Sequence, residues 1–208
     1  MTARWIDRLE RPLGFLEVPN LAALLAGMNA LSAALTFVKP EFPAELVLDP
    51  SLLARGQVWR AVTFILVPPA LSPLLLVFWL LLYFSYLSTL EKLWGSFRLT
   101  LYVLLGALCT AAGCAAMGVP LGSGVFVTSL FLAFARENPD VKILLFLLVP
   151  VRLKWLATVV WAFITWSFLF GGYGERLALL SGLVNYALYF GGEHAFEIKQ
   201  LWRRRRYR

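Results

Sequence analysis

The stretch LEKLWGSFR, residues 90–98, joins the two longest apolar runs of the chain, which cover residues 71–90 and 99–119. A helix needs about 20 apolar residues to cross a bilayer core about 30 Å thick, and both runs meet that length. A short charged connection between two such runs predicts a tight turn between neighbouring membrane helices. Gly95 would permit this turn, because glycine has no Cβ to restrict the backbone.

The composition of the whole chain agrees with this beginning. Of its 208 residues, 60% are hydrophobic and 15% are charged, and the mean hydropathy is +0.75. Soluble domains carry about a quarter charged residues. The sequence therefore indicates an all-α polytopic membrane protein and excludes an ordinary soluble domain.

Six apolar spans can be identified between the charged segments, with residues 39–69 as a long loop after the first. They cover residues 21–38, 71–90, 99–119, 121–135, 155–170 and 177–190. The last three are close to fifteen residues long, which is short for a span. We expect residues 1–20 to precede a six-helix membrane domain at 21–192, and residues 193–208 to form a basic tail. The apolar run 143–151 is too short to cross and is expected to belong to a connecting loop.

The basic residues orient these spans. Of the 19 lysines and arginines, 15 lie in the two termini and in the second and fourth loops, and 4 lie on the opposite side. The positive-inside rule then predicts that both termini are cytoplasmic. The net charge of +7 is explained by this orientation, so we expect no nucleic-acid partner. Cys109 and Cys114 face different sides of one helix, which predicts neither a disulfide nor a metal site, and no cofactor is expected.

The long first loop contains GQVWRAVTF, residues 56–64, and is rich in aromatic residues and proline. Long loops of this kind are commonly ordered and functional. Because tryptophan prefers the membrane interface, we expect the loop to lie there, with Trp59 and Arg60 anchoring it at the membrane surface.

Three segments together resemble the rhomboid superfamily. They are GQVWRAVTF, LEKLWGSFR and AFARENPDVKILLFLLVPVRLKWLA (residues 133–157), and they occur in the family's order. The resemblance covers about residues 56–190 and implies a six-helix rhomboid-like bundle. Derlins share this fold and carry the W-R pair and the acidic turn. We expect structural roles for these motif residues: Glu91 and Arg98 would pair and cap backbone groups at the turn that Gly95 permits.

Active rhomboids carry their nucleophile in G-x-S-G at the start of the fourth helix. The matching letters here are LGSG, so Ser123 takes the serine position, although counting back from AFAR places it on Gly124. The family's histidine base stands three residues before a glycine that packs on the fourth helix. Here that glycine is Gly182, and Leu179 takes the place of the base. The single histidine, His194, follows the last span on the opposite side of the membrane.

The parts that would stabilise an oxyanion are also replaced. Where active members carry a histidine and an asparagine on the second helix, this chain has Trp79 and Leu75. A serine without a base remains protonated and is a poor nucleophile. We therefore expect a catalytically degenerate pseudoprotease in which Ser123 is a small residue that allows close helix packing.

A rhomboid-like fold without chemistry is expected to bind transmembrane clients or a partner membrane protein, and short helices would thin the surrounding bilayer. Client contacts could involve Ser123, Thr128 or Asn185, although packing within the bundle is the stronger expectation for each. Two alternatives are a divergent intramembrane serine protease that uses Ser123, and a small-molecule transporter or channel. A transporter predicts polar or charged residues inside the spans, and apart from Asn185 and hydroxyl side chains the sequence has none there.

The final segment EHAFEIKQLWRRRRYR, residues 193–208, would bind anionic headgroups and fix the orientation of the chain. It could also dock a cytosolic partner such as an ATPase or a protease. The expected location is a membrane: the bacterial inner membrane, or an ER-type membrane in a eukaryote.

Overall fold

The computed structural model describes residues 4–145 and 149–206 and is almost entirely helical. Six helices correspond to the six predicted spans. They are α2 (Leu21–Val38), α6 (Pro73–Trp94), α7 (Ser96–Met117), α8 (Gly124–Glu137), α9 (Leu153–Phe170) and α10 (Tyr173–Arg206). By length and composition, four segments of the described chain can cross a membrane: Leu9–Val38, which includes α2, and the helices α6, α7 and α9. The predicted class, an all-α membrane protein, is confirmed.

The lengths of the last three helices correct the expectation that all of them are short. Only α8 is short, since its 14 residues rise about 21 Å. Helix α9 has 18 residues, which lies within the usual range for a span. Helix α10 has 34 residues and extends far beyond the apolar run at 177–190.

Helix α7 forms the centre of the bundle, and α9 lies at its edge. Helix α7 packs against α10, α6 and the loop helix α5 (Arg60–Thr63). In the most apolar stretch of each helix, 56% of the α7 residues are buried, against 17% for α9. Much of the α9 surface therefore faces the surroundings of the bundle.

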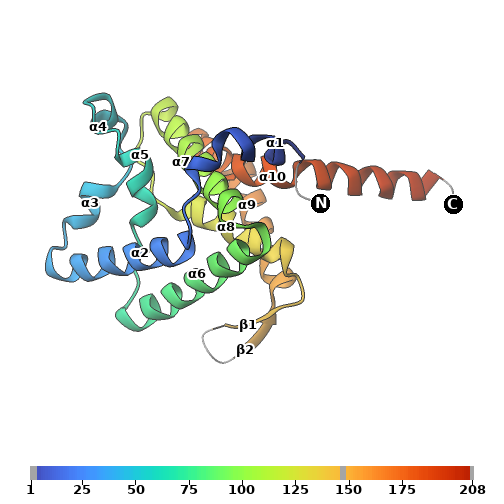
Figure 1. Cartoon of the computed structure of the whole chain (residues 1–208), viewed down its shortest axis with the longest axis horizontal. Helices are drawn as coiled ribbons and strands as arrows, with labels where there is room; N and C mark the ends of the chain where they lie inside the picture. The colour runs from blue at the N-terminus through green and yellow to red at the C-terminus, as the bar shows by residue number, and fades with distance from the viewer. Residues whose placement is uncertain (1–3, 146–148, 207–208) are drawn as a thin grey trace.

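The first loop is ordered, as its composition predicts. It contains α3 (Phe42–Leu46), α4 (Pro50–Ala54), α5 and a 3-10 turn, η2 (Phe64–Leu66). Leu48, Phe64 and Ile65 are buried in the main hydrophobic core. A backbone hydrogen bond from Leu121 to Leu48 ties the loop to the segment before α8. The loop is therefore folded onto one end of the bundle (Figure 1).

The connection between α8 and α9 contains the only strands of the described chain. The strands β1 (Lys142–Leu145) and β2 (Val149–Arg152) pair antiparallel, so part of the expected loop is a β-hairpin. The short apolar run at 143–151 pairs with itself instead of lying as an irregular loop. The hairpin extends from the body below α6 and α9 (Figure 1).

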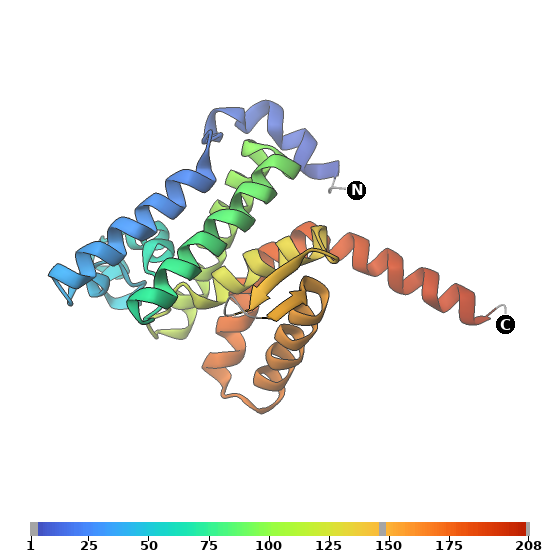
Figure 2. The same cartoon turned by 90° about the horizontal axis from the view of Figure 1, so that it is seen from below.

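Both ends of the chain are helical. The first helix, α1 (Arg4–Leu13), contributes the fully buried Ile6 to the core. At the other end, α10 continues across residues 192 and 193 without a break, so the expected tail is an extension of the last helix. This extension projects away from the body in both views (Figures 1 and 2). The side chains of residues 201–208, which include the basic run, lie outside the part that the structure describes.

Candidate functional site

Ser123 is the residue immediately before α8, and Gly124 is the first residue of that helix. The Ser123 side chain is 8% exposed, and its Oγ donates a hydrogen bond of 2.7 Å to the carbonyl of Val67. Val67 follows η2 at the end of the first loop. The hydroxyl of Ser123 therefore fastens the loop to the start of α8.

Helices α8 and α10 meet next to this position. A Cβ added to Gly182 would lie 2.5 Å from Cγ1 of Val125, so the glycine allows a close approach of the two helices. Leu179 stands about one turn before Gly182 and packs against the main core. Leu179 has an aliphatic side chain, which can neither accept nor donate a proton.

Trp79 and Leu75, which take the expected positions of the oxyanion donors, both lie on α6. The ring of Trp79 stacks on Tyr83, with centroids 4.9 Å apart. Leu75 is 37% exposed, so part of its side chain faces outward. Tyr83 is fully buried, and its hydroxyl has no hydrogen-bond partner among the described residues. Sequence reasoning missed Tyr83, because a tyrosine in an apolar run carries no motif.

His194 lies within α10 instead of beyond it. Its ring nitrogen Nε2 is 3.1 Å from the hydroxyl of Tyr186, and the two rings are in contact. Fifteen residues of continuous helix separate His194 from Leu179, which corresponds to about 22 Å along the axis. That distance agrees with the expectation that His194 stands far from the region of Ser123.

A polar network connects three helices within the core. The side-chain amide of Asn185 donates a hydrogen bond of 3.1 Å to Ser129 Oγ, and Tyr102 donates to the Ser129 carbonyl. Gly106 of α7 makes room for this contact, since an added Cβ would lie 2.5 Å from the Asn185 amide nitrogen. Asn185 is fully buried, which favours an interhelical role over a direct client contact.

Thr128 has its hydroxyl engaged within its own helix. Its Oγ1 donates a hydrogen bond of 2.9 Å to the carbonyl of Gly124. The side chains of Ser123, Thr128 and Asn185 therefore all form hydrogen bonds within the protein. The hydroxyl donors of Ser123 and Thr128 are both used, and Asn185 is fully buried.

Arg60 and Trp59 have different surroundings in the first loop. Arg60 is 6% exposed, and its guanidinium donates to the carbonyls of Ala44 and Val47 and to the side chain of Gln57. It therefore connects segments of the first loop to one another, a role that the sequence did not predict. Trp59 is 56% exposed, as an interfacial side chain would be.

Glu91 ties the turn to the first span. Its carboxylate accepts hydrogen bonds from the backbone N–H groups of Leu21 and Ala22 and from the Ser96 hydroxyl. It thereby caps the N-terminus of α2, whose own cap residue Asn20 makes no side-chain cap. This capping of a distant helix was not predicted, since the sequence suggested a role within the turn.

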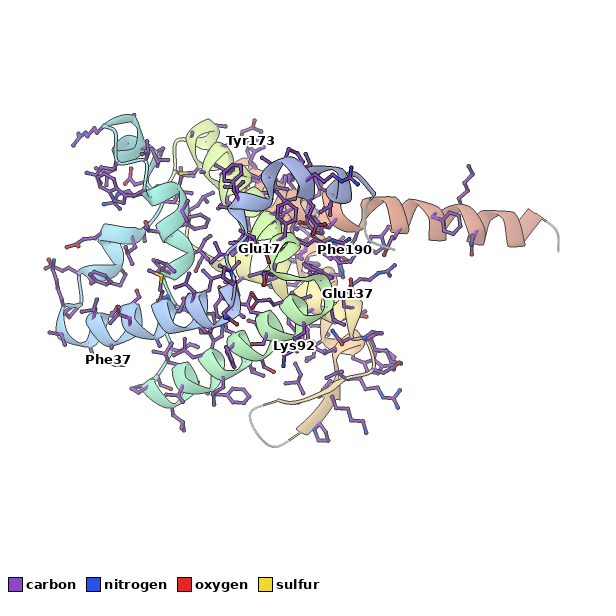
Figure 3. The ribbon with its side chains drawn as sticks, viewed as in Figure 1. Glu17, Phe37, Lys92, Glu137, Tyr173 and Phe190 are labelled. Atoms are coloured by element: carbon purple, nitrogen blue, oxygen red, sulfur yellow. The ribbon has the colours of Figure 1, made fainter. Side chains whose placement is uncertain are left out.

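Gly95 and Arg98 complete that turn. Gly95 has φ +85°, a backbone conformation that favours glycine, as the tight turn requires. The backbone carbonyl of Arg98 accepts a hydrogen bond of 2.8 Å from the Tyr189 hydroxyl. The side chains of Glu17, Lys92 and Glu137 lie toward this end of the bundle, far from Phe37 at the other end of α2 (Figure 3).

The described residues contain no group of three histidine, cysteine or acidic side chains that could hold a metal ion. Both cysteines are free.

Comparison with known families places these features in context. Residues 19–203 match the model of the Der1-like family. No curated protein matches the chain at a comparable level of significance. Because the family match spans most of the sequence and agrees with the apolar helices described above, this chain is a multi-pass integral membrane protein of the Der1-like family, within the rhomboid superfamily.

Proposed function

We propose that this protein is a non-catalytic rhomboid-like membrane protein that binds transmembrane clients or a partner membrane protein and assists their quality control, degradation or trafficking. Members of the Der1-like family are generally catalytically inactive. One observation carries the proposal: the Ser123 hydroxyl donates a hydrogen bond to the carbonyl of Val67, and the resemblance to rhomboids gives Leu179 as the residue in place of the base. A serine hydroxyl without a base attacks a peptide bond very slowly.

The proposed topology has six spans and two cytoplasmic termini. It is supported by the distribution of basic residues, of which 15 of 19 would then face the cytoplasm. In this arrangement residues 1–20 and 193–208 flank a membrane domain at 21–192. The basic end of the chain would contact anionic headgroups or a cytosolic partner.

Local thinning of the bilayer forms a second part of the proposal. Helix α8 rises about 21 Å, whereas the hydrocarbon core of a bilayer is about 30 Å thick. A bilayer adapts to a short span by thinning around it. Electron cryomicroscopy of the protein in nanodiscs would measure the membrane thickness beside α8, and an even thickness all around the protein would contradict this part.

Clients would approach between α6 and α9. Both helices pack on α8 but make little contact with each other (Figure 2). The outer surface of α9 carries exposed aromatic side chains that suit contact with an apolar helix. They are Trp155, Trp161, Phe163, Trp166 and Phe170.

A serine-directed fluorophosphonate probe tests whether the protein is an enzyme. We expect no labelling of the purified protein beyond that of a heat-denatured sample. Labelling that disappears in Ser123→Ala but persists in Ser51→Ala, a serine in the first loop, would establish Ser123 as a nucleophile and refute the proposal.

Site-specific photocrosslinking in native membranes tests client binding. A photoreactive amino acid at Phe163 on α9 should form adducts with other membrane proteins, which mass spectrometry would identify. The matched control replaces Phe37, an equally exposed aromatic residue at the end of α2. Adducts of equal yield at the two positions, or none at either, would contradict a client surface on α9.

A further inference from the structure

A groove runs along α6 toward the β-hairpin. It has a volume of about 310 Å³, within the range of small-molecule pockets. Its walls are mainly apolar side chains of α6, α8 and β1, together with the hydroxyl-bearing Ser85. The apolar lining residues are Phe78, Leu82, Tyr86, Phe134, Val141 and Ile143.

A lysine also lines the groove. Lys142, the first residue of β1, lines the same space and is exposed. From Phe78 to Tyr86 the groove follows α6 for about 12 Å. It therefore combines apolar walls of that length with one positive charge.

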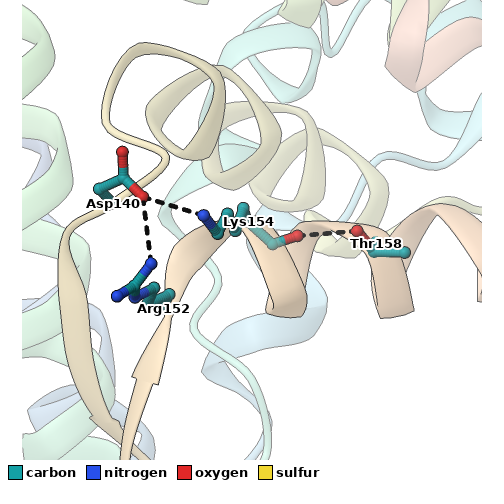
Figure 4. A network of polar contacts seen from close by, with 4 residues as sticks. All are labelled: Asp140, Arg152, Lys154 and Thr158. Atoms are coloured by element: carbon teal, nitrogen blue, oxygen red, sulfur yellow. Dashed lines mark hydrogen bonds and ion pairs between the residues drawn. The ribbon is translucent and has the colours of Figure 1, made fainter.

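The charge around Lys142 is not balanced by the protein. Lys142 stands directly opposite Arg152 in the hairpin register, and like charges at paired positions repel each other. The Asp140 carboxylate lies 3.0 Å from Lys154 Nζ and 3.7 Å from Arg152 Nη1, as Figure 4 shows. Lys142 forms no hydrogen bond or ion pair with any described residue, so Asp140 pairs with two of the three cations and leaves Lys142 without a counter-charge in the described part of the chain.

Glu137, at the end of α8, has another partner. Its carboxylate accepts a hydrogen bond of 2.9 Å from the indole nitrogen of Trp94, and no ion pair joins it to Lys142 among the described residues. An external anion would relieve the repulsion between Lys142 and Arg152. A phosphate held at the membrane–water interface has the required charge and position.

We propose that this groove binds one anionic phospholipid, with its phosphate between Lys142 and Arg152 and part of an acyl chain along α6. The chemistry of the walls favours a lipid over a client helix, because a phospholipid combines an anionic headgroup with an apolar chain, as the groove combines Lys142 with apolar walls. The site goes beyond the proposed function and would exist whether or not clients bind at α9.

Native mass spectrometry tests the site on the full-length protein. The purified chain is titrated with phosphatidylglycerol and with phosphatidylcholine of equal acyl length, and retained lipids are counted. Lys142→Gln should weaken phosphatidylglycerol binding about fivefold, the loss expected for one basic residue near the surface, and should weaken phosphatidylcholine binding less, because the choline group offsets the charge of its phosphate. Lys92→Gln removes the same charge from an exposed position on α6 outside the groove and should change the binding of neither lipid.

A second variant tests the acyl channel. Ser85 is exposed, so Ser85→Phe should fill the groove without disturbing the core, and it should weaken the binding of both lipids. Equal losses in Lys142→Gln and Lys92→Gln would show diffuse attraction and overturn the proposal. Photocrosslinks from position 82 that capture protein and no lipid would also overturn it, without affecting the crosslinks from Phe163.

Discussion

The two ends of the helical bundle are each held by one charged side chain that binds backbone groups. At the end covered by the first loop, Arg60 donates to the carbonyls of Ala44 and Val47. At the opposite end, Glu91 accepts from the N–H groups of Leu21 and Ala22. The hydrogen bonds of Arg60 stay within the first loop. Those of Glu91 join it to residues that lie 70 and 69 positions away in the chain. The comparison teaches that similar chemistry stabilises a local segment at one end and the whole bundle at the other.

The comparison predicts its largest effect at Glu91. Glu91→Ala removes the acceptor for two backbone N–H groups and one hydroxyl, and hydrogen bonds to a charged group contribute about 1.5–3 kcal/mol each. Because the lost bonds join α2 to the α6–α7 turn, we expect the free energy of unfolding to fall by about 3 kcal/mol. Reversible unfolding in detergent micelles would measure it.

Glu17→Ala provides the control for that measurement. Glu17 is an exposed acid at the same end of the bundle. If Glu91→Ala and Glu17→Ala lowered the free energy of unfolding equally, the hydrogen bonds from α2 to Glu91 would contribute nothing beyond the charge of the carboxylate. The contrast with Arg60 would then fail.

Arg60→Ala should act on the loop more than on the bundle. It leaves two carbonyls without their donor, at a cost of about 2 kcal/mol. We expect amide hydrogen exchange in residues 42–54 to become about thirtyfold faster, while exchange in α7 stays slow. Arg55→Ala removes an exposed arginine from the same loop and should leave exchange unchanged. A faster exchange that extends through α7 would mean that Arg60 stabilises the whole bundle, as Glu91 does.

The sequence predicted the bundle better than it predicted the roles of these two residues. Apolar runs and their charged flanks located α2, α6 and α7 within a few residues, and the glycine before α7 marked the turn. The partner of Glu91 could not be found this way, because a pattern along the chain does not reveal contacts between residues 70 positions apart. Arg60 beside an exposed tryptophan suggested the membrane surface, since burial of an arginine depends on carbonyls supplied by the folded loop.

Two further differences have local reasons. The apolar run ends at residue 190 and a separate tail was expected from residue 193, but glycine costs a helix only about 1 kcal/mol per residue, and α10 continues through Gly191 and Gly192. The run at 143–151 was too short for a span, and its β-branched residues allowed a hairpin that length alone did not indicate. In the candidate site, sequence comparison located Ser123, Leu179 and Gly182, but the bond from Ser123 to Val67 depends on how the loop folds.

Close packing near Ser123 allows a test of intermediate size. In Gly182→Ala the new methyl group would lie 2.5 Å from Val125, so helices α10 and α8 must separate. Overpacking of this kind costs about 1–3 kcal/mol. Gly191→Ala is the matched control, because its Cβ would meet nothing within 4 Å, and it should be neutral or slightly stabilising. Adding Val125→Ala to Gly182→Ala should recover part of the lost stability in thermal unfolding. If stability does not recover, the strain does not lie between residues 182 and 125.

The smallest effect is expected at the β1–β2 hairpin, which lies outside the contacts of Arg60 and Glu91. The pKa of Asp140 lies below its ordinary value of 3.8, because Lys154 donates a hydrogen bond to the carboxylate and the positive charges of Lys154 and Arg152 favour its ionised form. A carboxyl group whose pKa is lowered by folding contributes stability at pH values above 3.8, and this contribution disappears as the pH falls through the lower, folded pKa. Asp140→Asn should therefore unfold at a slightly lower temperature than the wild type at pH 7, and the difference should vanish near pH 2. Because Asp140 is exposed, added salt should reduce the difference at pH 7 as well. A difference that persisted at low pH and high salt would mean that Asp140 stabilises the hairpin through its shape and hydrogen bonding alone, and that the cations around it are balanced by another group.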